Sequence, residues 1–292
     1  MSDDGRHGLT VIAFIGSVFS PYYASARRRA PGAADPLNHC ALNVALYGEG
    51  GHRWAMTERG RGAVHRDAEM LAIGPSSLAW DGDVLTLHID EVSVPWPSRL
   101  RGTVRLHPAA FTGCSFALDA SGHHHWHPLA PSARVEVDLG RPGLRWQGAG
   151  YLDANDGTVP LEQDFRGWQW SRADLGAQRS LVLYDTEPCR GAPTSLALQF
   201  DADGAVRACP AAPVAPLRGT GWRLARSTRS DAGTTARVLQ TLEDAPFYAR
   251  SLVGSTWCGQ PVRAVHESLS LQRFSNRVVQ CMLPFRMPRV SK

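Results

Sequence analysis

Lysine is almost absent from this 292-residue sequence, in which Lys292 is the only example. Arginine therefore carries nearly all of the positive charge, and the formal net charge at pH 7 is +4. Basic residues are not interleaved with aromatic residues along one element, as a nucleic-acid-binding face would require. The composition predicts no nucleic-acid partner and is compatible with contact to an anionic membrane surface.

Long apolar runs are also missing. The stretch from Leu9 to Phe19 is shorter than the roughly 20 residues that a membrane-spanning helix needs. The Ser-Pro-Tyr-Tyr sequence that follows it, Ser20 to Tyr23, is not a small-residue cleavage site. The valine, isoleucine and phenylalanine residues of the stretch from Leu9 to Phe19 favour a β-strand. We therefore predict neither an export signal nor a transmembrane helix.

Closely spaced cysteines are absent, although the chain has six cysteines in all. In a chain of this length, scattered cysteines do not indicate a disulfide framework. We predict free thiols in a reducing cytoplasm for Cys40, Cys114, Cys189, Cys209, Cys258 and Cys281.

Helical periodicity is nearly absent and turn signals are frequent. Only Gln272 to Cys281 has apolar residues at helical spacing, whereas Ser77 to Asp90 predicts a hairpin that turns at Asp81-Gly82. Further expected features are hairpins around Gly48–Gly51 and Asp201–Gly204, an exposed loop at Ala24–Ala34 and a Pro-rich loop or linker at Cys209–Pro216. Short strands at regular intervals predict an all-β sandwich or barrel architecture.

Sequence motifs for common enzyme chemistries are also missing. The chain has no Gly-x-Ser-x-Gly nucleophile elbow, no P-loop and no Gly-x-Gly-x-x-Gly sequence that opens a helix. The pairs Asp81/Asp83 and Asp201/Asp203 are better explained as turns than as phosphate or metal sites. These absences argue against serine hydrolases and nucleotide-dependent enzymes.

Aromatic and charged side chains concentrate between Gly148 and Arg172. The alternation from Leu144 to Asp153 predicts a strand, on which Tyr151 and Asp153 point to the same face. Asn155-Asp156-Gly157 predicts a turn, and the spacing of its acidic residues does not fit a calcium loop. On the residues alone, Asp153 is equally well explained as a carboxylate that caps its own turn.

Four histidines surround a tryptophan between Ser121 and Pro128. On an extended segment, His124 and Trp126 share one face, and His123, His125 and His127 take the other. Adjacent histidines fit a tetrahedral site poorly, and no cysteine pair or distant histidine at finger spacing completes a ligand set. We predict no metal here; alone, the pattern also suits an ordinary strand histidine and a core tryptophan.

Together these clusters resemble the carotenoid 1,2-hydratases, also called hydroxyneurosporene synthases. The resemblance covers nearly the whole chain and is carried by several segments in one order. They are Gly8–Tyr23, His124-x-Trp126, Gly150-Tyr-Leu-Asp-Ala-Asn155, Trp168-x-Trp-Ser-Arg172 and Met282-Leu-Pro-Phe-Arg-Met-Pro288. The family is similar to two-domain lipocalin-like proteins. This resemblance implies two tandem β-barrel or sandwich domains, residues 1–165 and 166–292, with a short C-terminal helix and the catalytic cluster in the first domain.

The resemblance implies hydration of the terminal C1–C2 double bond of an acyclic carotenoid such as neurosporene or lycopene, without a cofactor. The partners implied are this apolar substrate and water, in the carotenoid biosynthesis of photosynthetic bacteria, with peripheral contact to the inner membrane. It assigns Asp153 as the acid, His124 as a partner that hydrogen-bonds it and returns its proton, and Trp126 and Tyr151 as aromatic groups near the cation. Burial would keep Asp153 protonated, whereas a charged His124 would favour its ionised form.

Two other functions remain open. A lipocalin-like carrier would bind an isoprenoid without needing a poised acid, and a relative with the same fold could perform another cation or cycloaddition reaction. Trp168, Trp170 and Arg172 are interpreted as structural, because a Trp-x-Trp pair fits the wall of a barrel equally well.

Overall fold

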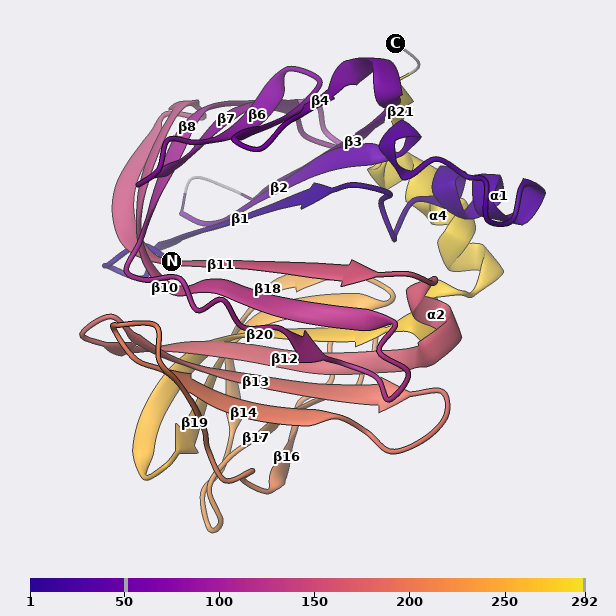
Figure 1. The fold of residues 1–292 in the computed structure, drawn as a ribbon. Helices are drawn as coiled ribbons and strands as arrows, with labels where there is room; N and C mark the ends of the chain where they lie inside the picture. The colour runs from indigo at the N-terminus through magenta and orange to yellow at the C-terminus, as the bar shows by residue number, and fades with distance from the viewer. Residues whose placement is uncertain (50–51, 291–292) are drawn as a thin grey trace. The chain divides into compact units, whose positions relative to one another are not determined.

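The computed structural model describes residues 1–49 and 52–290, which form mainly antiparallel β-strands (Figure 1). The strands up to residue 157 are β1 (His7–Phe14), β2 (Cys40–Gly48), β3 (Arg53–Arg59), β4 (Val64–Arg66), β5 (Met70–Ile73), β6 (Ser76–Trp80), β7 (Leu85–Val92), β8 (Arg99–Pro108), β9 (Phe116–Ala117), β10 (His124–Arg141) and β11 (Leu144–Gly157). The later strands are β12 (Phe165–Gly176), β13 (Arg179–Pro188), β14 (Ser195–Phe200), β15 (Val206–Ala208), β16 (Val214–Leu217), β17 (Arg226–Arg229), β18 (Arg237–Asp244), β19 (Tyr248–Trp257), β20 (Gln260–Ser270) and β21 (Arg289–Val290). The helices are α1 (Pro21–Arg29), α2 (Leu161–Asp164), α3 (Leu271–Phe274) and α4 (Arg277–Arg286).

The strands form four open sheets. Their strand orders are β1-β2-β3-β21, then β11-β10-β8-β7-β6-β5-β4 with β9 beside β10, then β15-β14-β13-β12-β20-β19-β18, and finally β16-β17. Many neighbouring pairs are antiparallel hairpins joined by short turns, such as β6–β7 and β12–β13, whereas β1–β2 and β12–β20 are joined by long segments and β21 pairs in parallel with β3. The predicted all-β class with short C-terminal helices is confirmed, and the sheets do not close on themselves.

The chain folds into two compact units. The first comprises residues 1–108, 134–150 and 280–292, and the second comprises residues 109–133 and 151–279. The long strands β10 and β11 each contribute one end to each unit. Each unit is therefore assembled from several segments of the chain, and the predicted domain boundary near residue 165 stays a prediction.

The core of the first unit is aliphatic. Strand β2 is buried along nearly its whole length, and its side chains pack against those of β7, β8 and β10. The buried members of this cluster are Leu42, Val44, Leu46, Ala55, Leu87, Ile89, Leu100, Val104, Val135, Val137 and Leu139. Removing these side chains from water at about 25 cal/mol per Å² is the main force that holds the unit together.

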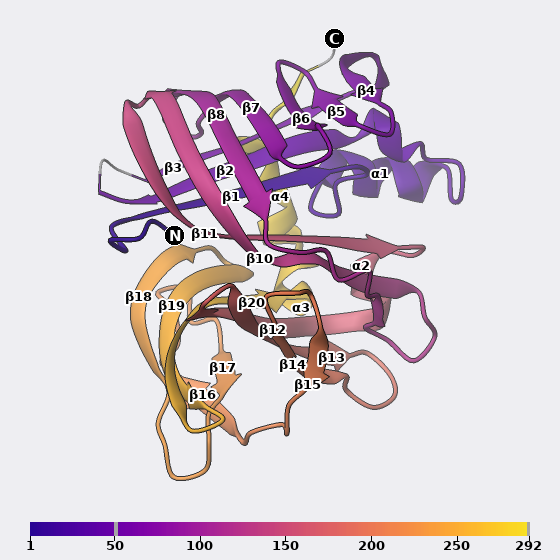
Figure 2. The same cartoon turned by 60° about the vertical axis from the view of Figure 1, so that its left-hand side comes forward.

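The second unit is built on the seven-stranded sheet. One face of this sheet is covered by the β16–β17 hairpin, which lies within the bend of the sheet in Figure 2. Polar contacts join the two layers: the Ser171 hydroxyl lies 3.3 Å from Thr228, and the guanidinium of Arg226 donates to Ser251 Oγ at 2.7 Å. The opposite face of the sheet is therefore the one that remains for other contacts.

The structure corrects three local predictions. The first six residues of the expected loop at 24–34 belong to helix α1, which forms because Ser20 Oγ accepts a hydrogen bond from the Tyr23 amide and Pro21 fits the first helical position, and the remainder of the stretch is not helical. The expected turn at 155–157 is part of β11, which continues to Gly157 beside the start of β10. The Pro-rich stretch 209–216 includes the first residues of β16.

Other local predictions are confirmed. The 77–90 hairpin forms from β6 and β7, the 201–204 hairpin forms from β14 and β15, and the C-terminal helical stretch appears as α3 and α4. Strands β2 and β3 pair as predicted, although Gly50 and Gly51 of their turn lie outside the described residues. All six cysteines are free thiols. Among the helices of the described chain, none has the length and hydropathy needed to cross a membrane.

Candidate active site

A row of polar and aromatic side chains crosses the open face of the seven-stranded sheet. In the strand register, Trp170 on β12 lies between Tyr184 on β13 and Glu267 on β20, and Glu267 lies opposite Arg250 on β19. Arg250 and Glu267 form an ion pair, and both residues belong to the second unit. An ion pair between buried Arg250 and half-buried Glu267 thus lies beside two aromatic rings on this face of the sheet.

Tyr151 from β11 packs on this row. Its ring centroid lies 5.4 Å from that of Trp170, and the guanidinium carbon of Arg172 lies 5.9 Å from the Tyr151 ring centroid. Arg172 is buried and donates to the carbonyl oxygen of Pro131 at 3.1 Å. Desolvation lowers the pKa of its guanidinium, although the group remains charged because its ordinary pKa is so high.

Two hydrogen-bond donors converge on one oxygen of Asp153. Trp126 Nε1 and the Tyr151 hydroxyl both donate to Asp153 Oδ2, each at 2.9 Å. The other oxygen, Oδ1, receives no hydrogen bond from a described residue and is not among the buried atoms that lack a partner. When the carboxyl group is protonated, the proton therefore belongs on Oδ1, where it is accessible to a molecule in the site.

The environment of Asp153 raises its pKa to about 6. Desolvation is the largest cause, even though the residue as a whole is only half-buried, and the negative charge of Glu267 acts in the same direction. The two hydrogen bonds at Oδ2 and the positive charge of Arg250 oppose this shift. The carboxyl group is thus held between its acid and its base form near neutral pH, as a general acid requires.

Trp126 is fully buried. Its ring packs edge-on against Tyr184 and Phe200 at centroid distances of 5.7 and 6.4 Å, and it lies 5.6 Å from Phe116. A ring enclosed on all sides has one fixed orientation, so its N–H points at Asp153 in a defined direction. The structure thus brings together Trp126, Tyr151 and Asp153 of the four predicted residues.

His124 lies in a different place from the one expected. Its Nε2 is 3.2 Å from Asp164 Oδ2, its ring packs on Phe165 at 5.0 Å, and no hydrogen bond to Asp153 is present among the described residues. Burial lowers the pKa of this imidazole, while Asp119 and Asp164 act to raise it. A Cβ atom on Gly157 would lie 2.4 Å from His124 Nδ1, so only glycine fits opposite the ring. The catalytic role of His124 stays a prediction.

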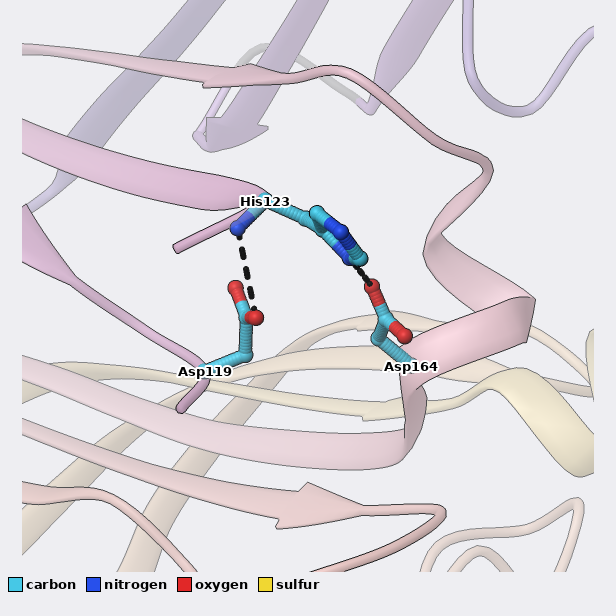
Figure 3. Close-up of side chains that lie close together, drawn as sticks. All are labelled: Asp119, His123 and Asp164. Atoms are coloured by element: carbon cyan, nitrogen blue, oxygen red, sulfur yellow. Dashed lines mark hydrogen bonds and ion pairs between the residues drawn. The ribbon is translucent and has the colours of Figure 1, made fainter. Parts of the chain in front are cut away.

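Asp119, His123 and Asp164 lie close enough together to hold a metal ion (Figure 3). Their atoms already have other partners, however. The carboxylate of Asp119 accepts hydrogen bonds from the amides of residues 121, 123 and 124, and His123 Nδ1 lies 2.9 Å from Asp164 Oδ2. These contacts are those of a carboxylate that caps a loop and of a histidine–aspartate pair that fixes α2 beside it. The group therefore explains the position of the β10 start without a metal.

Several residues of the site were missed by the sequence reasoning. Trp170 and Arg172, which the sequence predicts to be structural, lie beside Tyr151, and the period-two spacing of Trp168, Trp170 and Arg172 is the signal that they share one face. Tyr184, Arg250 and Glu267 carried no comparable signal. They reach the site only because β12 pairs with both β13 and β20, which no local pattern specifies.

The chain is similar to known proteins over nearly its whole length. The chain is 56% identical over 291 residues to an acyclic carotenoid 1,2-hydratase of Thiocapsa roseopersicina, covering 99% of this chain and 71% of that protein. It is 42% identical over 280 residues to an acyclic carotenoid 1,2-hydratase of Cereibacter sphaeroides, covering 96% and 98% of the two chains. The crystal structure of a Nitrosomonas europaea protein described as an AttH shares the fold, with a TM-score of 0.64 at 16% identity over 92% of this chain and 88% of that one. Residues 11–292 match the family model described as carotenoid hydratase CrtC, and the chain belongs to this family of hydro-lyases.

Proposed function

We propose that this protein adds water to the terminal C1–C2 double bond of an acyclic carotenoid such as neurosporene or lycopene, giving a 1-hydroxy carotenoid. The observation that carries the proposal is the asymmetric carboxyl group of Asp153. Two donors occupy Oδ2, and Oδ1 is left as the oxygen that can present a proton to a bound substrate.

Protonation of carbon is the difficult step, because an isolated alkene is a very weak base. In the proposed reaction, the O–H bond at Asp153 Oδ1 breaks and its proton bonds to C2. The π electrons form that C–H bond, and a tertiary cation remains at C1. The indole N–H and the phenol O–H stabilise the carboxylate that results, which makes the protonated group a stronger acid. Burial acts in the opposite direction and keeps the proton on the group until the substrate arrives.

The cation at C1 is stabilised by groups that are already in place. The ring of Tyr151, which lies at a tilt against Trp170, offers a π-face, and the new Asp153 carboxylate lies beside it. A cation–π contact is worth up to about 2 kcal/mol when desolvated, or a factor of about 30 in rate. The remaining acceleration must come from orientation of the acid and from the fixed charges of the site.

Water completes the reaction. Its oxygen bonds to C1, one of its protons returns to the Asp153 carboxylate, and the enzyme is restored with no net change in charge. Any participation of His124 requires a bridging water or a relay, since its Nε2 lies 3.2 Å from Asp164 Oδ2. Neither step calls for a redox group.

The test is Asp153→Asn, compared with Asp156→Asn as a matched control. Asp156 lies on the same strand, is exposed, and contacts His127 Nε2 at 2.5 Å. We expect Asp153→Asn to lose at least about a hundredfold in hydration, the usual size of a general-acid contribution, and to keep binding carotenoid. Asp156→Asn should retain activity. Activity of Asp153→Asn within tenfold of the parent would rule out this acid.

A carrier function is distinguished by the same experiment. A carrier would bind neurosporene or lycopene and release it unchanged in the parent protein as well as in the variant. A carboxyl group with a raised pKa and two dedicated donors has no purpose in a carrier, and it therefore favours the enzyme.

A further inference from the structure

Arginine side chains border a surface cavity of about 520 Å³, and all of its lining residues belong to the first unit. None of its lining residues is acidic. They come from the start of β3, the start of β8 and the turn between β10 and β11, and are Arg53, Ser98, Arg99, Arg101, Arg141 and Pro142.

The positive charge of this cavity is only partly compensated. Arg99 donates to Asp90 at 2.9 Å, and Arg101 lies 3.9 Å from the same carboxylate, so one acidic group serves two arginines. Arg101 and Arg99 remain 72% and 59% exposed in their side chains. Arg141 is also exposed. A cluster of this kind attracts anions, and guanidinium groups bind phosphate oxygens in pairs.

An apolar loop tip adjoins the arginines. The loop between β7 and β8 contains Pro95, Trp96 and Pro97, and Trp96 is 84% exposed, the most exposed large apolar side chain of the described residues. The loop is held in place by hydrogen bonds from Ser93 Oγ to the Trp96 carbonyl at 2.7 Å and from Arg53 Nε to Ser98 Oγ at 2.9 Å. In the sequence, only Pro97 separates the exposed tryptophan from Ser98 in the wall of the cavity.

We propose that this surface, the Arg53/Arg99/Arg101/Arg141 cavity together with Trp96, docks the protein on an anionic phospholipid membrane. Tryptophan is enriched at membrane–water interfaces because its ring is apolar and its N–H is polar, and arginines beside it meet the lipid phosphates. A free phosphate ion would use the arginines and would leave the exposed tryptophan without a function. The proposal rests on the proposed function in one respect: an apolar substrate has to be collected from a membrane.

Sedimentation with vesicles tests the proposal. The probes are phosphatidylcholine vesicles with and without about one third phosphatidylglycerol. The parent protein should bind the anionic vesicles in low salt and bind them much more weakly at about 0.5 M NaCl, since salt screens exposed charges. The double variant Arg101→Gln/Arg141→Gln should weaken binding to anionic vesicles by about 30-fold, because each arginine near an anionic surface contributes about 1 kcal/mol. Trp96→Ala should weaken it by about tenfold.

Matched controls remove the same charge and the same ring elsewhere. Arg28→Gln/Arg29→Gln takes two exposed arginines from the end of α1, and Trp222→Ala removes another exposed tryptophan. Both should bind anionic vesicles within about threefold of the parent. Equal losses of vesicle affinity in the two double arginine variants would show that binding depends only on net charge. This result would overturn the proposal. A protein that binds millimolar inorganic phosphate at constant ionic strength and does not bind anionic vesicles would assign the cavity to a free anion. This result would also overturn the proposal.

Failure of this proposal can be separated from failure of the proposed function. Asp153→Asn should bind vesicles as the parent does, although it no longer hydrates carotenoid. A parent protein that hydrates neurosporene in detergent micelles and ignores anionic vesicles would refute the docking surface alone.

Discussion

The sharpest prediction concerns Tyr151→Phe and the pH dependence of hydration. The active form of Asp153 is the protonated one, so kcat/KM of the parent should be constant below about pH 6 and fall tenfold per pH unit above it. Tyr151 donates one of the two hydrogen bonds that lower this pKa. Removing the hydroxyl should therefore move the falling limb to higher pH.

The size of the shift follows from the bond that is lost. A hydrogen bond to a charged group contributes about 1.5–3 kcal/mol, and about 1.4 kcal/mol corresponds to one pKa unit. The midpoint of the limb should therefore rise by about 1 to 2 units. Tyr151 itself does not titrate in this range, because burial raises its own pKa well above the ordinary value.

The assay is turnover of neurosporene in detergent micelles between about pH 5 and 9. The maximal rate should fall as well, because the variant has a weaker and less well oriented acid, while the profile shifts upward. Tyr22→Phe, on α1 of the other unit, serves as the control and should reproduce the parent profile. A limb that stays in place or moves to lower pH in Tyr151→Phe would refute the role assigned to this hydroxyl.

The same geometry has three further testable consequences. Asp153→Asn should raise the free energy of unfolding at pH 7 by about 1–2 kcal/mol. The parent loses stability as pH rises from about 4 to about 6, because the pKa of Asp153 is about 6 in the folded protein and 3.8 ordinarily. This difference corresponds to roughly 3 kcal/mol, part of which is screened by solvent, and in urea melts the gain should vanish below about pH 4. Trp126→Phe and Trp126→Leu should both shift the pH limb upward as Tyr151→Phe does, and Trp126→Leu should in addition lower the melting temperature because a fully buried ring is lost; a limb that stays at the parent's pH in both variants, with only the melting curves changed, would leave Trp126 as a wall residue. Chelators should leave turnover unchanged, and stoichiometric zinc in protein purified without a metal-affinity step, with loss of activity on its removal, would contradict the hydrogen-bonded interpretation of the Asp119 cluster.

The sequence was sufficient where local rules decide the structure. Period-two alternation placed Tyr151 and Asp153 on one face, and glycine-containing turns predicted the β6–β7 and β14–β15 hairpins. The all-β class followed from the near absence of helical periodicity, and the family followed from ordered motifs over the chain.

The remaining features depend on pairings between distant strands. Strand β11 continues through Asn155 to Gly157 because it pairs with the start of β10, where His127 contacts Asp156, and this outweighs a strong local turn signal. The Glu267–Arg250 pair depends on the register of β19 and β20. His124 turns to Asp164 because α2 places that carboxylate beside it, which a strand pattern alone could not indicate.

The unequal oxygens of Asp153 have a consequence for the isotopic stereochemistry of the product. If a single oxygen both delivers the proton to C2 and recovers one from the attacking water, hydrogen and hydroxyl join the same side of the double bond. In D₂O the enzyme would then add deuterium to only one of the two enantiotopic positions at C2. The new CHD group would therefore be a stereocentre of a single configuration. Trp126 and Tyr151, which bind Oδ2 and leave Oδ1 to deliver the proton, would in this way determine the configuration at C2 without contacting that carbon.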